Sequence, residues 1–242
     1  LFVLGLLFDL TGLLVLGLLI LGLLFATEAT TSISRKAGYN IKNPGSGFIF
    51  QSSLSLVSRA LIFMFMPLIG YLSDKNELVS DYRSIIGLFL FIPFFLLVVR
   101  IFRYKIEAFF GNILFRISEN GNYLKKSRSK YSIDTRKYSS SKKFNRFYSL
   151  FFVAYVPYYI SWPIIIILLD NFNESRGLIL GLSSIFNGIN TIIITTILDP
   201  KLAQLGMFNN LIMKIYDDLI LIRFYVSIIS LFVLAIVIYY IN

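Results

Sequence analysis

One arginine, Arg59, stands inside a long apolar stretch, residues 48–73, which is long enough to cross a bilayer. A cation at that depth is costly, so it normally faces the protein interior or a wet cavity and marks a functional site. At helical spacing, four polar side chains share the face of Arg59: Gln51, Ser52, Ser55 and Ser58. The pattern predicts a polar stripe from one membrane surface to a guanidinium near mid-membrane. The alternative is a structural arginine that bonds the carbonyls of a neighbouring helix.

A second charged group follows the first apolar stretch. Glu28 and Arg35 are seven residues apart, and so lie on one face of a helix. They form either an interfacial ion pair of little energetic weight or part of a substrate site. We expect Glu28 to lie close to a cation, with Arg35 the first candidate. Arg35 and Lys36 are expected to collect an anionic head group at the cytoplasmic mouth.

A second polar stripe lies between apolar flanks in residues 177–198. Its small and polar members recur at helical spacing: Gly181, Ser184, Asn187, Gly188, Thr191 and Thr195. Such a stripe indicates either the wall of a polar cavity or ordinary contact between membrane helices. Asp199-Pro200 is expected to end this helix.

Several kinds of chemistry are excluded by what the chain lacks. It has no Cys and no His, which removes disulfides, thiol chemistry and His–metal sites. It also has no P-loop, no H-E-x-x-H and no G-x-S-x-G motif. Asp217 and Asp218 are adjacent, and so point in different directions on a helix. We therefore expect neither an enzyme nor a bound cofactor or metal.

The elements that must position these residues are membrane helices. The chain is 57% hydrophobic with a mean hydropathy of +0.75, which is typical of an integral membrane protein. The first span lacks the basic start and small-residue cleavage site of a signal peptide, and its Gly22, Ala26 and Thr30 offer a face for close helix packing. The sequence predicts a single all-α domain, a bundle of six spans at about 1–30, 48–73, 84–102, 147–169, 177–198 and 219–241.

Charge predicts the orientation and some of the partners. The net charge is +10, and between residues 100 and 146 thirteen Lys and Arg stand against three Asp and Glu. The positive-inside rule therefore places loops 36–47 and 103–146 in the cytoplasm and both termini outside. Residues 106–117 are amphipathic and are expected to lie in the interface, with the basic loop near anionic lipid. No folded basic domain stands apart from the membrane, so nucleic acid is not an expected partner.

Three stretches in order carry a family resemblance. The first is Glu28-Ala-Thr-Thr-Ser-Ile-Ser-Arg-Lys-Ala-Gly38, and the second is Leu54-Ser-Leu-Val-Ser-Arg59 with Pro67, Gly70 and Asp74. The third is Phe186-Asn-Gly-Ile-Asn-Thr-Ile-Ile-Ile-Thr-Thr-Ile-Leu-Asp-Pro200. Together they resemble the Amj family of lipid II flippases of the bacterial inner membrane. The resemblance implies transport without ATP hydrolysis by this chain. In the mechanism that we expect, the polar stripe of residues 177–198 lines the path of the sugars.

The sequence thus predicts a flippase for an undecaprenyl-diphosphate-linked glycan, either lipid II or an O-antigen-type unit. Six helices give few walls for a bulky glycan, which favours a homodimer. The rivals are an assembly subunit that transports nothing and a membrane enzyme acting on a lipid phosphate. The expected substrate-binding residues are Arg59, Arg35, Lys36, Glu28, Gln51, Ser55, Ser58, Asn187, Thr191 and Asp199.

Overall fold

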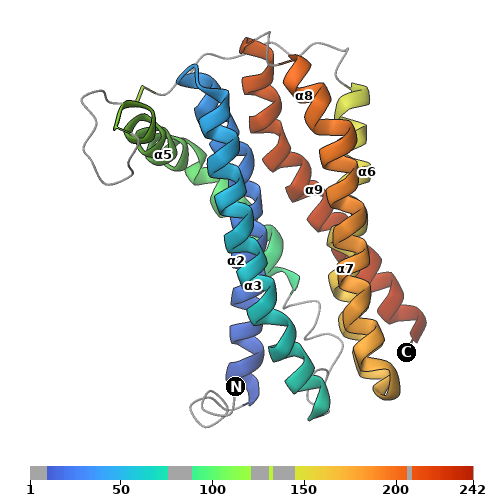
Figure 1. The fold of residues 1–242 in the computed structure, drawn as a ribbon. Helices are drawn as coiled ribbons and strands as arrows, with labels where there is room; N and C mark the ends of the chain where they lie inside the picture. The colour runs from blue at the N-terminus through green and yellow to red at the C-terminus, as the bar shows by residue number, and fades with distance from the viewer. Residues whose placement is uncertain (1–9, 76–88, 121–130, 133–144, 206–208, 242) are drawn as a thin grey trace.

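The computed structural model describes residues 10–75, 89–120, 131–132, 145–205 and 209–241, and within these ranges the protein is helical with no strand (Figure 1). This confirms the predicted all-α fold. The elements are α2 (Leu10–Asn40), α3 (Pro44–Asp74), α5 (Phe91–Asn120), α6 (Asn145–Asn171), the 3-10 turn η2 (Asn173–Ser175), α7 (Arg176–Ile193), the π-helical turn η3 (Ile194–Leu198), α8 (Asp199–Leu205) and α9 (Asn209–Ile241).

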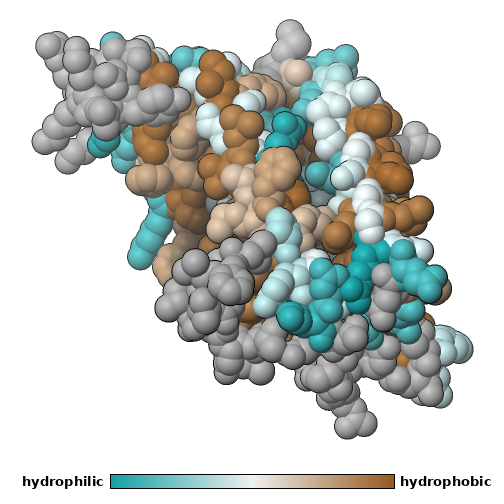
Figure 2. All heavy atoms as spheres, turned by 60° about the horizontal axis from the view of Figure 1, so that its bottom comes forward, coloured by the Kyte–Doolittle hydropathy of each residue, from teal (hydrophilic) through white to brown (hydrophobic). Residues whose placement is uncertain are grey.

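Five helical stretches are long and apolar enough to cross a membrane, which confirms a multi-pass membrane protein. They are Gly12–Asn40, Pro44–Asp74, Phe147–Asn171, Arg176–Leu205 and Ile212–Tyr240. Large apolar side chains are exposed on their outer faces, among them Phe63, Leu178 and Phe232. Figure 2 shows hydrophobic residues over much of the described surface, interrupted by hydrophilic ones. Such a surface suits a lipid environment.

The first helix ends about ten residues later than predicted, at Asn40 and not near residue 30. Helix α2 continues through the polar segment to Asn40, because its hydroxyl side chains donate to carbonyls three or four residues earlier, as Thr30 does to Thr27 at 2.7 Å. The predicted loop 36–47 shrinks to a tight turn, in which Lys42 has a φ of 59°. The side chain of Asn43 then caps α3 by accepting from the backbone N–H of Ser46 at 3.2 Å.

Helix α5 joins two elements that the sequence treats as separate. The end of the predicted span at 84–102 and the amphipathic segment 106–117 form one helix, and its second half slants away from the bundle (Figure 1). It is absent from the five apolar stretches; Arg100, Arg103 and Lys105 interrupt its apolar sequence. Residues 84–88 and most of the predicted basic loop lie outside the described residues.

The long helices form two groups of three. Helix α2 packs against α3 and α5, α6 packs against α7 and α9, and the groups meet mainly where α9 contacts α2 and α5. Helices α2, α3 and α5 run up, down and up in Figure 1, whereas α6, α7 and α9 run down, up and down. The two triplets therefore have opposite directions, and α2 begins at the end of the bundle where α9 ends.

Glycines allow the first triplet to pack closely. A Cβ on Gly22 would lie 2.4 Å from the ring of Phe95, so α5 fits against α2 only because this position has no side chain. At the tip of the α2–α3 hairpin, a Cβ on Gly38 would lie 2.7 Å from the Cα of Gly47. The small face predicted for the first span thus serves at Gly22 as a packing site for α5.

Candidate functional site

A cavity of about 410 Å³ lies between α3 and α7, with residues of α2, α6 and α9 also lining it. It contains nine of the ten predicted site residues, from four separate segments of the chain. These are Glu28, Arg35, Gln51, Ser55, Ser58, Arg59, Asn187, Thr191 and Asp199. The polar stripes of the second and fifth predicted spans therefore line the same cavity.

The polar stripe of α3 forms one wall. Ser52 and Ser58 donate to the carbonyls of Phe48 and Leu54, at 3.1 and 3.3 Å, so both hydroxyl donors have hydrogen-bond partners within their own helix. Arg59 lies beyond them, and its side chain is exposed. Within the part of the chain that the structure describes, Arg59 makes no hydrogen bond or ion pair. The cavity thus holds a guanidinium whose donors are available to a ligand.

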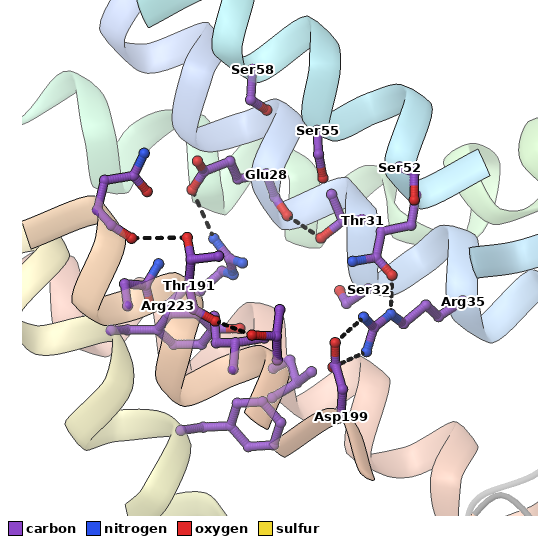
Figure 3. A pocket seen from close by; sticks show the side chains of 18 of the residues that line it. Glu28, Thr31, Ser32, Arg35, Ser52, Ser55, Ser58, Thr191, Asp199 and Arg223 are labelled. Atoms are coloured by element: carbon purple, nitrogen blue, oxygen red, sulfur yellow. Dashed lines mark hydrogen bonds and ion pairs between the residues drawn. The ribbon is translucent and has the colours of Figure 1, made fainter. Parts of the chain in front are cut away.

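Arg35 bridges the cavity at the end nearest the α2–α3 turn. Its Nη1 and Nη2 donate to the two carboxylate oxygens of Asp199 on α8, at 2.5 and 2.9 Å, and its Nε donates to Gln51 of α3 (Figure 3). The guanidinium also lies 4.6 Å from the ring centre of Phe48. This two-pronged contact is the strong form of an arginine–carboxylate bond, and it ties α2 to the other side of the cavity.

The position of Asp199 depends on a change in helix geometry. The sequence predicts that Asp199-Pro200 ends a helix, but the chain stays helical through η3 into α8. Pro200 has no N–H to donate to an earlier carbonyl, and a π-helical turn directly precedes it. Such turns change the direction in which the following side chains point. Asp199 is brought in this way to face Arg35.

Glu28 pairs with an arginine other than the expected one. Its carboxylate accepts from Nη1 of Arg223 on α9 at 3.3 Å (Figure 3). It also accepts from the hydroxyl of Tyr158 on α6 at 2.8 Å. Arg35 lies about 10 Å further along α2, since seven residues separate the two. The predicted Glu28–Arg35 pair is therefore replaced by two pairs, one for each residue.

Sequence reasoning missed Arg223, although a signal for it was present. Arg223 lies within the predicted span 219–241, and a cation at such a place is a functional candidate by the same rule that identifies Arg59. It is buried beside the ring of Tyr155, with the guanidinium carbon 4.2 Å from the ring centre.

The Glu28–Arg223 pair gives a first testable prediction. Glu28→Gln and Arg223→Gln should each lower the thermal stability of the purified protein, because each leaves the other charge buried without its partner. The double variant should be no less stable than the poorer single variant, as a double-mutant cycle of unfolding temperatures would show. Fully additive losses would contradict a direct pair.

Lys36 lies outside the cavity, contrary to its predicted role at the mouth. Its Nζ contacts carboxylates of Glu107 on α5 and Asp217 on α9, at 2.8 and 2.9 Å, and its side chain is only 2% exposed. One step along a helix turns a side chain by about 100°, which carries Lys36 away from the cavity that Arg35 faces. Asp217 and Asp218 do diverge as expected, since Asp218 accepts from Tyr148 at 2.7 Å.

A metal site is not formed by the described residues, which contain no group of three or more Asp and Glu able to hold an ion. The chemistry of the cavity is that of hydrogen bonding and charge. No family model matches the chain, and neither a curated protein nor a solved structure does. The family resemblance therefore rests on the three sequence stretches alone.

Proposed function

We propose that the protein is a flippase that moves an amphiphile with a diphosphate head, an undecaprenyl-diphosphate-linked glycan, across a bacterial inner membrane. One observation carries the proposal: a polar cavity inside a membrane bundle exposes Arg59 with no partner among the described residues. An unpaired cation within a bilayer is costly unless a ligand or water reaches it. A diphosphate supplies the matching charge and geometry.

The location of Arg59 suits a crossing point for the head group. Arg59 is the middle residue of α3, which has 31 residues, so it lies halfway along a helix of about 46 Å that would cross a membrane core of about 30 Å. The head would exchange part of its hydration for Arg59 and the neighbouring hydroxyls. The sugars would then meet the polar face of α7 at Asn187 and Thr191.

The prenyl tail would stay in lipid, passing between α3 and α7. These two helices touch each other little along most of their length and meet near the lower end, where Arg176 donates to Asp74 at 2.5 Å. On α7, a Cβ at Gly181 or Gly188 would meet nothing within 4 Å, so both glycines face open space and not a neighbouring helix. The two oppositely directed triplets could rock about their contact at α9 to give alternating access.

A non-transporting assembly subunit is the second candidate. The open glycines of α7 favour it, because small residues on a lipid-facing helix let a partner helix, including one from a second copy, pack closely. A translocation assay separates the two functions. Purified protein in vesicles should carry a fluorescent undecaprenyl-diphosphate glycan to the inner leaflet. Expression of the protein should also rescue cells depleted of their known flippases. An inactive but partner-bound protein would favour the subunit.

Labelling of single cysteines tests the proposed orientation, because the native chain has no Cys to interfere. Lys42 is exposed in the α2–α3 turn, and Ser175 is exposed at the opposite end of the bundle. In intact cells, Lys42→Cys should resist an impermeant thiol reagent and Ser175→Cys should react. Labelling in the reverse sense would show that the basic turn faces outward.

A further inference from the structure

The arginines of the cavity differ in what already binds them. Arg35 holds the carboxylate of Asp199, Arg223 holds that of Glu28, and Arg59 has no such partner among the described residues. Two of the three arginines that line the cavity are therefore already paired with a carboxylate of the protein. An anionic ligand entering this space competes with those acids.

The contact at Arg35 has the geometry that a phosphate would take. Two parallel N–H groups meet two oxygens of Asp199, at 2.5 and 2.9 Å, and phosphate oxygens fit the same fork. The fork is held in place from behind, because Gln51 accepts from Nε and the ring of Phe48 lies against the guanidinium. A ligand would thus find the arginine already oriented.

The exposed fractions of the Arg35 and Asp199 side chains indicate which of the two moves when a ligand enters. The side chain of Arg35 is 7% exposed, whereas that of Asp199 is 23% exposed. Asp199 begins the short helix α8, directly after the π-helical turn, and Arg35 lies within the long helix α2, which is packed against α3 and α5. The carboxylate can therefore swing into water more easily than the guanidinium can move.

We infer that Arg35 is a second anion subsite of the cavity, masked by Asp199, and that a phosphate of the lipid head binds by displacing that carboxylate. The inference rests on the proposed function and gives the head two successive cations. Gln51 and Arg59 are eight residues apart on α3, about 12 Å along the helix, so the Arg35 subsite precedes the one at Arg59. Displacement of Asp199 also breaks the bridge between α2 and α8 at this end of the cavity.

Two substitutions beside Arg35 should act in opposite directions. Asp199→Asn removes the competing charge but keeps an acceptor, so undecaprenyl diphosphate in detergent micelles should bind about tenfold more tightly. Gln51→Glu adds a competing charge at the same guanidinium, with nearly the same shape, and binding should weaken about tenfold. Both effects should disappear in an Arg35→Gln background.

Asp74→Asn provides the matched control. It removes the same charge from another Arg–Asp contact of 2.5 Å, at the far end of the bundle and outside the cavity, so the affinity should stay at the wild-type value. Inorganic pyrophosphate, titrated in parallel, separates a lipid head from a free phosphate. Pyrophosphate binding as tightly as the lipid would assign the subsite to a soluble phosphate.

Unchanged affinity in both Asp199→Asn and Gln51→Glu would overturn the masked subsite, as would shifts that persist without Arg35. If Asp199→Asn does not accumulate, Gln51→Glu decides alone, since the new carboxylate keeps the acceptor for Nε of Arg35. Failure of the flippase proposal looks different. In that case the wild type would translocate no diphosphate lipid in vesicles, whatever these two variants do to binding.

Discussion

Transport should fall at least about a hundredfold when Arg59 is replaced by alanine, because a guanidinium gives a phosphate several charge-assisted hydrogen bonds of about 1.5–3 kcal/mol each. The amount of folded protein should hardly change, since Arg59 makes no hydrogen bond or ion pair with the described residues. Arg59→Lys should recover part of the activity, because an ammonium supplies the charge without the planar fork.

Translocation per folded molecule is the deciding measurement for Arg59. Lys75→Ala is a suitable control, because Lys75 is an exposed cation directly after the same helix and outside the cavity. It should transport like the wild type. Near-wild-type translocation activity in Arg59→Ala, normalised to folded protein, would contradict the proposed mechanism. A loss of folded protein with normal activity per molecule would make Arg59 a structural residue.

Lys36→Met should cause the largest loss of stability, about 3–5 kcal/mol, because it leaves the carboxylates of Glu107 and Asp217 without their shared cation. Glu107 is 1% exposed and retains the hydroxyl of Tyr131, which donates to it at 2.6 Å. The loss should appear as a lower unfolding temperature in detergent. It should not require a defect in ligand binding, because Lys36 lies outside the cavity.

Two further variants test this explanation, one as a control and one as a partial rescue. Lys42→Met removes an exposed cation from the nearby turn and should leave the unfolding temperature unchanged. Glu107→Gln added to Lys36→Met should restore part of the stability, because one buried charge no longer lacks a partner. An unfolding temperature like that of the wild type in Lys36→Met would contradict the buried cluster.

Local signals in the sequence were sufficient for most of the spans and for much of the cavity wall. Apolar runs predict membrane helices, and helical spacing alone puts Gln51, Ser55, Ser58 and Arg59 on one face, which the structure turns toward the cavity. Helix continuity was harder to predict. The polar end of α2 resembles a loop in composition, yet its hydroxyls are satisfied within the helix.

Ion-pair partners could not be predicted, because they depend on how distant helices meet. Glu28 and Arg223 are 195 residues apart, and Arg35 and Asp199 are 164 apart. Spacing along one helix suggested Arg35 as the partner of Glu28, but a residue two turns away on a rigid helix lies too far for contact. The predicted role of Lys36 was wrong for a related reason. Its charge suits an entrance for an anionic ligand, but its side chain points from α2 toward α5 and α9.

The neighbouring residues Arg35 and Lys36 restrict how the molecule can move. They leave α2 about 100° apart, and each is held by carboxylates on other helices. Rotation of α2 about its own axis would strain both ion-pair attachments at once, because the two side chains point in different directions from the helix. Gly38 and Gly47 also fix α3 against α2 at the hairpin tip. While both attachments persist, α2 is held against rotation about its own axis, and displacement of Asp199 by a ligand would release one of them.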